Sequence, residues 1–227
     1  MAEEIATRDV QVEIAGERVV LLPERALYWP AAATLLVADP HVGKAATFRA
    51  GGIFVPRGTT SSTLARLDAA IVRTAATRLV FLGDLLHARE GRAAETLRRV
   101  AEWREAQPSL EVVLVRGNHD RKAGDPPAEL GIACVDAPML EGAFAFAHHP
   151  TMLPEHHVLA GHIHPSARLS GPGRQFERLP CFWIRRDVTV LPAFGDFTGL
   201  GDVEPSEGDR VFAIAEGAVV EIGIPSP

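Results

Sequence analysis

The chain has 227 residues, of which 47% are hydrophobic and 23% are charged, and this composition predicts a single globular domain over residues 1–227. No apolar run approaches the roughly 18–20 residues of a membrane-spanning helix, and the acidic start MAEEIATRDV is unlike a signal peptide, so we expect a cytoplasmic protein with no membrane partner. The net charge of −6 argues against an overall basic surface for nucleic acid.

The basic residues are almost all arginine, since Lys44 and Lys122 are the only lysines among 23 basic residues. A compositional bias of the source genome explains this most simply. The planar guanidinium group of arginine also binds phosphate through several N–H donors, so a local phosphate-binding patch is compatible with the negative net charge. Cys134 and Cys181 lie in apolar stretches, which predicts buried free thiols rather than a disulfide.

The first half of the chain alternates strand and helix patterns. Two β-rich runs joined through Gly16 predict a hairpin. Short apolar runs then alternate with segments whose apolar residues recur at helical spacing. The expected strands are Gln11–Ile14, Arg18–Leu22, Thr34–Ala38, Leu79–Leu82 and Glu111–Val115, and the expected helices are Thr63–Ala76 and Arg92–Ala106.

The second half contains strand patterns with little helix between them. These are Ala143–Ala147, Val158–Ala160, Cys181–Ile184, Thr189–Leu191, Val211–Ala215 and Ala218–Ile222. Such an order predicts an α/β fold in which two mixed sheets pack face to face with helices on the outside.

Metal-ligand side chains follow the predicted strands five times in succession. Because ligands gather at the carboxyl edge of strands in α/β sheets, we expect these side chains to meet in one site. Each short motif could arise by chance, but the ordered set is specific. The residues are Asp39 with His41; Asp84; Asn118 with His119 and Asp120; His148 with His149; and His162 with His164.

Two other catalytic patterns are excluded. Gly43-Lys44 is not a phosphate loop, because Ala38 and Ala45 stand where that motif needs glycine and serine or threonine. No serine or cysteine stands in a nucleophile elbow.

The set Asp39-x-His41, Gly83-Asp84, Gly117-Asn118-His119-Asp120, His148 and Gly161-His162-x-His164 resembles the calcineurin-like metallophosphoesterase superfamily. The resemblance implies a four-layer α-β-β-α sandwich with two divalent cations. One metal would be held by Asp39, His41 and His164. The other would be held by Asn118, His148 and His162, with Asp84 bridging the pair and His149 as the fallback for His148.

These residue types suit a two-metal hydrolase. A bridging carboxylate offsets the repulsion between two dications, which lower the pKa of a shared water so that hydroxide can attack phosphorus in line. Mixed nitrogen and oxygen ligands suit manganese, iron or zinc better than magnesium or calcium. The resemblance places His119 at the scissile phosphate, where it protonates the leaving oxygen or stabilises charge. It places Asp120 behind His119 as an orienting group; a turn-forming role is the alternative for Asp120.

Longer stretches resemble one bacterial branch, the manganese-dependent phosphoesterase encoded in DNA-repair gene clusters beside an Lhr-type helicase and an ATP-dependent ligase. This implies a single-strand DNA endonuclease, with the helicase and the ligase as expected partners. Pro40 and Leu200 depart from the pattern, away from the ligands. The stretches are Ala38–Ala45, Phe48–Ile53, Val55–Thr60, Leu179–Trp183 and Leu191–Gly199.

Basic residues follow the first and last ligand motifs and are candidates for holding DNA phosphates. Aromatic residues make up only 6% of the chain, which favours a shallow groove for backbone phosphates over a base-reading platform. A solvated arginine-rich surface is the alternative. The expected substrate contacts are Lys44, Arg49, Arg57, His87, Arg178 and Arg186, beside Arg168, Arg174 and Arg185.

Two other functions remain open. A phosphodiesterase or phosphomonoesterase for small or cyclic nucleotides would use the same centre. A non-catalytic scaffold of the same fold should have lost metal ligands or His119, and all of them are present.

Overall fold

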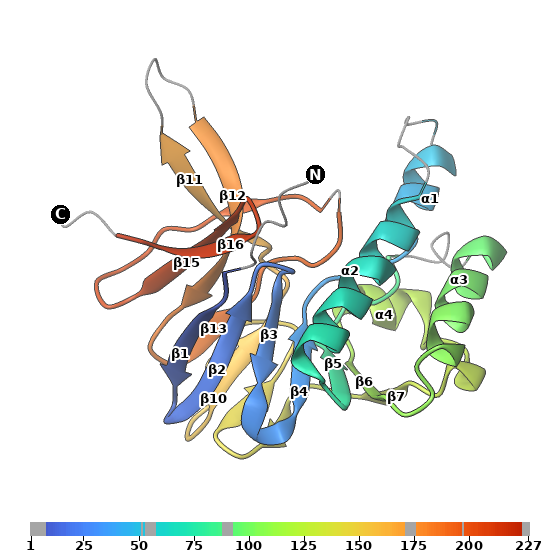
Figure 1. The fold of residues 1–227 in the computed structure, drawn as a ribbon, viewed down its shortest axis with the longest axis horizontal. Coiled ribbons are helices and arrows are strands. Elements are labelled where there is room, and N and C mark those ends of the chain that lie inside the picture. Colours follow the sequence, from blue (N-terminus) through green and yellow to red (C-terminus); the bar gives the residue numbers. More distant parts are fainter. Residues whose placement is uncertain are drawn as a thin grey trace, which may run out of the picture.

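The computed structural model describes residues 8–50, 52, 58–87, 93–170, 176–196 and 198–223, and the backbone alone at residues 46, 49, 50 and 170. Four α-helices lie in the first half of these ranges (Figure 1). They are α1 (Lys44–Ala50), α2 (Thr59–Thr74), α3 (Ala94–Glu105) and α4 (Asn118–Ala123).

A seven-stranded sheet runs in strict chain order. Its first four strands are antiparallel neighbours, and its last four pair in parallel, with helices in their connections. The strands are β1 (Val10–Ile14), β2 (Glu17–Leu22), β3 (Ala26–Trp29), β4 (Thr34–Val37), β5 (Arg78–Phe81), β6 (Glu111–Val115) and β7 (Ala133–Val135).

A nine-stranded sheet is formed by the rest of the chain. At its centre β10 pairs in parallel with both β9 and β13. The hairpin of β11 and β12 extends away from the body of the molecule (Figure 1). The strands are β8 (Met139–Glu141), β9 (Phe144–Phe146), β10 (His157–Ala160), β11 (Pro165–Ser170), β12 (Phe176–Ile184), β13 (Val188–Val190), β14 (Gly201–Asp202), β15 (Arg210–Ala215) and β16 (Ala218–Ile222).

The main core lies between the two sheets. Successive side chains of a strand point to opposite faces, so Leu36 packs toward the second sheet while its neighbour Leu35 packs toward the helices. Phe146 and Phe182 of the second sheet are fully buried against the same inner face. This burial of large apolar side chains on both sheets stabilises their face-to-face packing.

The helices cover the outer face of the seven-stranded sheet (Figure 1). Leu67 and Ile71 of α2 lie one turn apart and are buried there, as is Trp103 of α3. The expected fold class, two mixed sheets with outer helices, is confirmed. The second layer of helices that a four-layer sandwich implies is reduced. In the described part of residues 124–223, which contains the whole nine-stranded sheet, the helical structure is a single 3-10 turn, Ala128–Leu130.

Most expected elements are present, with ends shifted by a few residues. The pattern missed β3, β7, β8, β11 and β14 and the short helices α1 and α4. Cys134 and Cys181 are free thiols, as expected, and burial raises the pKa of Cys181 to about 12. Across the described residues, every helix is too short or too polar to cross a bilayer.

Candidate metal centre

The carboxyl ends of the central strands of both sheets meet at one place. The loop after β4 pairs with the loop after β13, since the Phe194 N–H donates to the Ala38 carbonyl at 2.8 Å. The His162 N–H, beyond β10, donates to Asp39 Oδ2 at 2.7 Å. These bonds connect the two sheets where the ligand motifs lie, so the expected convergence is present.

Backbone strain is concentrated in the same loops. Eleven described residues other than glycine have positive φ, and five of them are expected ligands. A positive φ is unfavourable for residues that carry a Cβ and persists where the surroundings enforce it, often at functional sites. The five are Asp39 (51°), His41 (44°), Asp84 (53°), His162 (71°) and His164 (53°).

A first group of donors consists of Asp39, His41 and His164, whose ligand atoms all lie within 4.8 Å of one another. His164 Nε2 is 3.5 Å from Asp39 Oδ1. Asp39 Oδ1 and His41 Nε2 are buried without any hydrogen-bond partner. Such orphaned polar atoms are costly, and a cation placed between them would satisfy both, so this group fits a metal.

Asp84 lies at the centre of the cluster and is almost fully buried. Its Oδ2 atom is 3.9 Å from His41 Nε2 on one side. On the other side the same atom is 3.5 Å from His148 Nε2. One carboxylate oxygen therefore faces both expected ligand groups, as a bridging ligand must.

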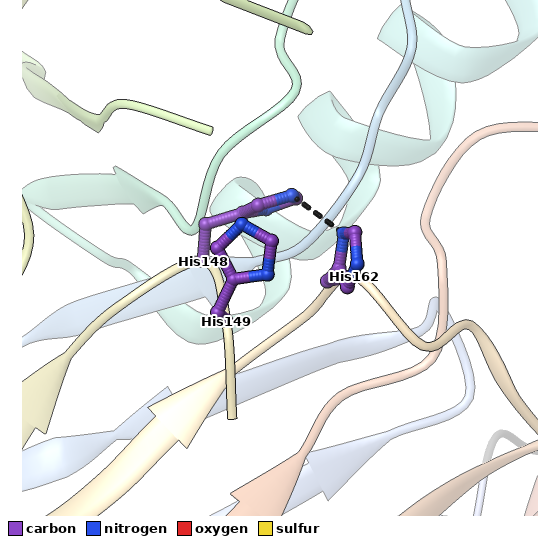
Figure 2. A group of neighbouring side chains, drawn as sticks. All are labelled: His148, His149 and His162. Carbon is purple, nitrogen blue, oxygen red and sulfur yellow. Dashed lines mark hydrogen bonds between the residues drawn. The ribbon is translucent and has the colours of Figure 1, made fainter. Parts of the chain in front are cut away.

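A second group surrounds His148. Its Nε2 is 2.9 Å from Asn118 Oδ1 and 3.0 Å from His162 Nδ1 (Figure 2). Its Nδ1 lies 3.1 Å from the Leu82 carbonyl, which orients the ring with Nε2 toward the other donors. A ring nitrogen of His149 also lies within 4.8 Å of the ligand atoms of His148 and His162, but His149 is exposed whereas His148 is buried, so burial favours His148.

The electrostatics keep the imidazoles neutral. Burial lowers the pKa of His41 to about 2, and the nearby positive charge of Lys44 acts in the same direction. Burial also lowers the pKa of His148 and of His162. Because a neutral imidazole keeps a lone pair free, these histidines can bind a cation without first losing a proton.

His119 stands beside Asp84 without being one of the grouped donors. Its Nδ1 lies 2.6 Å from the His87 carbonyl, and its Nε2 is 3.9 Å from Asp84 Oδ2. Because the carbonyl can only accept, Nδ1 carries a proton and Nε2 faces the centre. The ring of His87 stacks on that of His119, with centroids 5.0 Å apart.

Comparison with solved structures gives the family. The crystal structure of the Pseudomonas putida nuclease MPE has a TM-score of 0.84 and 45% sequence identity, over 95% of this chain and 100% of that chain. The chain belongs to the metallophosphoesterase family. The E. coli phosphoesterase Yfce has a TM-score of 0.40 and 15% identity, over 85% of this chain and 99% of its own. No protein-family model and no curated protein matches the chain.

Asp120 differs from its expected role in this metallophosphoesterase. Its buried carboxylate accepts N–H groups from Gly117 at 2.8 Å, Asp84 at 2.7 Å and Leu85 at 3.0 Å. The described hydrogen bonds of Asp120 thus go to main-chain N–H groups. The His87 carbonyl, and not Asp120, orients the His119 ring. These bonds fit the alternative role of Asp120, a turn-forming residue, because the bond to the Gly117 N–H closes the turn that begins α4 and the other two connect this turn to the loop after β5.

We expect Asp120→Ala to lower the free energy of unfolding by about 3–5 kcal/mol, because three buried N–H groups lose their acceptor. Urea denaturation of the metal-free protein measures this. Asp187→Ala, at an exposed turn, is the matched control and should change stability little. Equal stability of both variants would show that the carboxylate does not hold the two loops together.

Motif glycines pack directly against the ligands. A Cβ on Gly161 would lie 2.3 Å from Asp39 Oδ2, and one on Gly117 would lie 2.3 Å from Asp84 Oδ1. No L-residue fits at either distance, so these two positions need glycine for space. The sequence already indicated this need for glycine, because Gly161 and Gly117 each directly precede a ligand motif.

We expect Gly161→Ala to weaken metal binding about 10–100-fold, since the added methyl group displaces the Asp39 carboxylate. Isothermal titration with Mn²⁺ measures the affinity. Gly223→Ala serves as the control, because a Cβ there would meet no atom within 4 Å and the backbone at Gly223 does not have a positive φ. If Gly161→Ala bound Mn²⁺ as the unsubstituted protein does, the close packing on Asp39 would be irrelevant to the centre.

The expected substrate contacts divide into three groups. Lys44 and His87 lie at the site: Lys44 borders a small hollow with His41, and His87 Nδ1 is 3.3 Å from His41 Nδ1. Arg178 lies on β12, where it donates to Asp202 Oδ2 at 2.6 Å. The Arg49 side chain and Arg57 fall outside the described residues, as does Arg174.

Arg186 lies away from the site, so the prediction that it contacts the substrate is wrong. It lies in the turn before β13, whose first residue, Val188, pairs with Val158 near the start of β10. The ligand loop follows the other end of β10, at Ala160. Arg186 and the adjacent Arg185 therefore lie at the end of the sheet opposite His162, because a strand separates its two ends in space.

Proposed function

We propose that this metallophosphoesterase is a manganese-dependent endonuclease for single-stranded DNA that acts in DNA repair. The observation that carries the proposal is the position of Asp84, whose single oxygen faces donors of both groups at 3.5–3.9 Å. The similarity to the Pseudomonas putida nuclease, at 45% identity over 95% of the chain, supports a nucleic-acid substrate.

Each donor group would hold one cation. Asp39, His41 and His164 form the first set. Asn118, His148 and His162 form the second, and Asp84 would serve both. When bound, two such cations supply a hydroxide for in-line attack and neutralise charge on the phosphoryl oxygens. Mixed nitrogen and oxygen donors suit manganese, iron or zinc better than magnesium or calcium, and we propose manganese because the sequence resembles the manganese-dependent branch.

His119 supplies the acid in this proposal. His119 acts as an acid in its imidazolium form: Nδ1–H donates to the His87 carbonyl, and Nε2, the atom that faces Asp84, carries the second proton, which is the one transferred. A phosphate placed against the cluster would lie next to that atom. Nε2 then protonates the leaving oxygen of the cleaved strand.

The support for DNA rests on charge as well as on the relative. Lys44 lies near the first donor group, and its ammonium interacts with the negative charges of Asp39 and Asp84. It is positioned to hold a non-bridging oxygen of the substrate. We extend the proposal to a repair helicase and a ligase as partners, on the strength of the branch that the sequence resembles.

A matrix of metals and substrates tests the proposal. The protein is incubated with Mn²⁺, Fe²⁺, Zn²⁺ or Mg²⁺ and with circular single-stranded DNA, a cyclic nucleotide or a phosphomonoester. We expect Mn²⁺ to support cleavage of the circle, which requires an internal cut. Hydrolysis of the cyclic nucleotide or the monoester alone would replace the nuclease with a small-nucleotide phosphatase or phosphodiesterase. Inactivity with every pair would favour a scaffold.

A further inference from the structure

A cavity of about 360 Å³ opens directly beside the second donor group. Asn118, His148 and His149 are among the residues that line it. Met152 and Leu153, from the segment between β9 and β10, line it as well. The cavity and the candidate metal centre therefore share two residues, Asn118 and His148.

The chemistry of this cavity differs from that of the metal centre. Much of its lining is apolar, and Met152, one of the lining residues, is 66% exposed although it is large and hydrophobic. A concave apolar surface with a few polar groups is typical of a small-molecule subsite, and such sites measure roughly 300–1,000 Å³. The Thr151 hydroxyl and the Arg121 guanidinium are polar groups that line it as well.

The two arginines that line the cavity differ in how firmly carboxylates already bind their guanidinium groups. Arg116 donates two hydrogen bonds of 2.7 Å to Asp125, so its guanidinium group is already occupied. The Arg121 side chain is 62% exposed, and its described contact is a single ion pair of 3.4 Å with Asp136, itself 69% exposed. Such a surface pair contributes little, so Arg121 can turn to an incoming anion.

We infer that this cavity holds the nucleobase of one nucleotide that flanks the cleaved phosphodiester, with Arg121 at the next phosphate. The inference rests on the proposed function, because a phosphodiester held at Asn118 and His148 carries a nucleoside on each side. The adjoining cavity is within reach of one of these two nucleosides, because Asn118 and His148 line it too. A base has flat apolar faces, which suit the Met152 thioether and the His149 ring, and a polar edge, which suits Thr151.

Such a pocket would tolerate any base, because stacking uses the π-face that all bases share. It adds a stacking contact to the expectation drawn from the low aromatic content, namely a shallow groove for backbone phosphates rather than a base-reading platform. Here a methionine and a histidine provide the stacking surface in place of tyrosine or tryptophan.

Two esters with the same leaving group test the inference. Thymidine 5′-(p-nitrophenyl phosphate) carries a base, whereas methyl p-nitrophenyl phosphate does not, and both release the same coloured phenolate. Stacking contributes about 1–3 kcal/mol per base, which corresponds to roughly 5–150-fold in binding. We expect kcat/KM with Mn²⁺ to favour the thymidine ester about tenfold. Met152→Ala should reduce that preference several-fold through KM.

The matched control is Val72→Ala, since Val72 is an apolar side chain of α2 that is 76% exposed and does not line the cavity. It should keep the full preference. A second measurement uses single-stranded DNA with one abasic residue, where we expect about tenfold less cleavage at one of the two phosphates beside it. Met152→Ala should diminish this contrast.

Equal kcat/KM for the two esters together with equal cleavage at both phosphates beside the abasic residue would overturn the inference. A preference that Met152→Ala leaves intact would overturn it as well. Hydrolysis of both esters with preference for thymidine, but no cleavage of DNA, would remove the nuclease proposal and leave the base pocket standing. No hydrolysis of either ester and no cleavage of DNA with any metal would remove both.

Discussion

Asp84→Asn is expected to lower the phosphodiesterase rate by on the order of 10³-fold while the fold stays intact. The substitution keeps the size of the side chain and the acceptor for the His119 N–H, which bonds to Asp84 Oδ1 at 2.8 Å. It removes the negative charge that faces both donor groups. Transition-state stabilisation by metal ions amounts to several kcal/mol, and 1.36 kcal/mol corresponds to tenfold in rate.

Thermal unfolding with and without Mn²⁺ separates the role of Asp84 in metal binding from a role in stability. A cation that binds only the folded state raises the melting temperature, and this rise should be largely lost in Asp84→Asn. The metal-free variant should melt no lower than the metal-free parent, because a buried charge has been removed.

Asp68→Asn is the control for the Asp84 experiment. Its carboxylate accepts the Trp103 indole N–H at 2.7 Å among the outer helices, away from the centre. Asp68→Asn should keep both the activity and the stabilisation by Mn²⁺. An Asp84→Asn protein with normal rate and normal stabilisation by Mn²⁺ would contradict the shared role of this carboxylate.

His119→Ala is expected to keep both metal ions yet lose about 10²–10⁴-fold in the rate of DNA cleavage. The side chain is 34% exposed, and its Nε2 is not within either donor group, so its removal should leave the ligands in place. Metal content by mass spectrometry of the purified protein and cleavage of a labelled single strand measure the two properties.

The leaving group provides a further check on His119. A deoxyribose alkoxide needs a proton as it departs, whereas p-nitrophenolate is stable without one, so an acid catalyst matters more for DNA than for an aryl ester. His156→Ala, on the loop before β10, is the matched control and should be active on both. Equal losses on DNA and on the aryl ester would contradict the role of His119 as an acid, and unchanged cleavage of DNA would remove it from the mechanism.

The types and order of the ligands were predictable from the sequence because of how strands end. In a sheet of parallel strands the carboxyl ends share one edge, so polar residues after β4, β5 and β6 must lie near one another. The same local rule located most strands and both long helices, α2 and α3, from their apolar spacing. It missed α4 because Asn118–Ala123 has too few apolar residues to show a helical period.

Only the tertiary structure decided which of several neighbouring residues takes a given role. His148 and His149 are equivalent as sequence letters, but one is buried between Asn118 and His162 and the other is exposed. Asp120 bonds to main chain of two loops, and Arg186 lies at the far end of its sheet. Local sequence thus determined what kind of site this chain carries, because residue type and strand ends are local properties. Burial, orientation and distance come from the packing of two sheets whose strands are far apart along the chain, and these determined what each residue does.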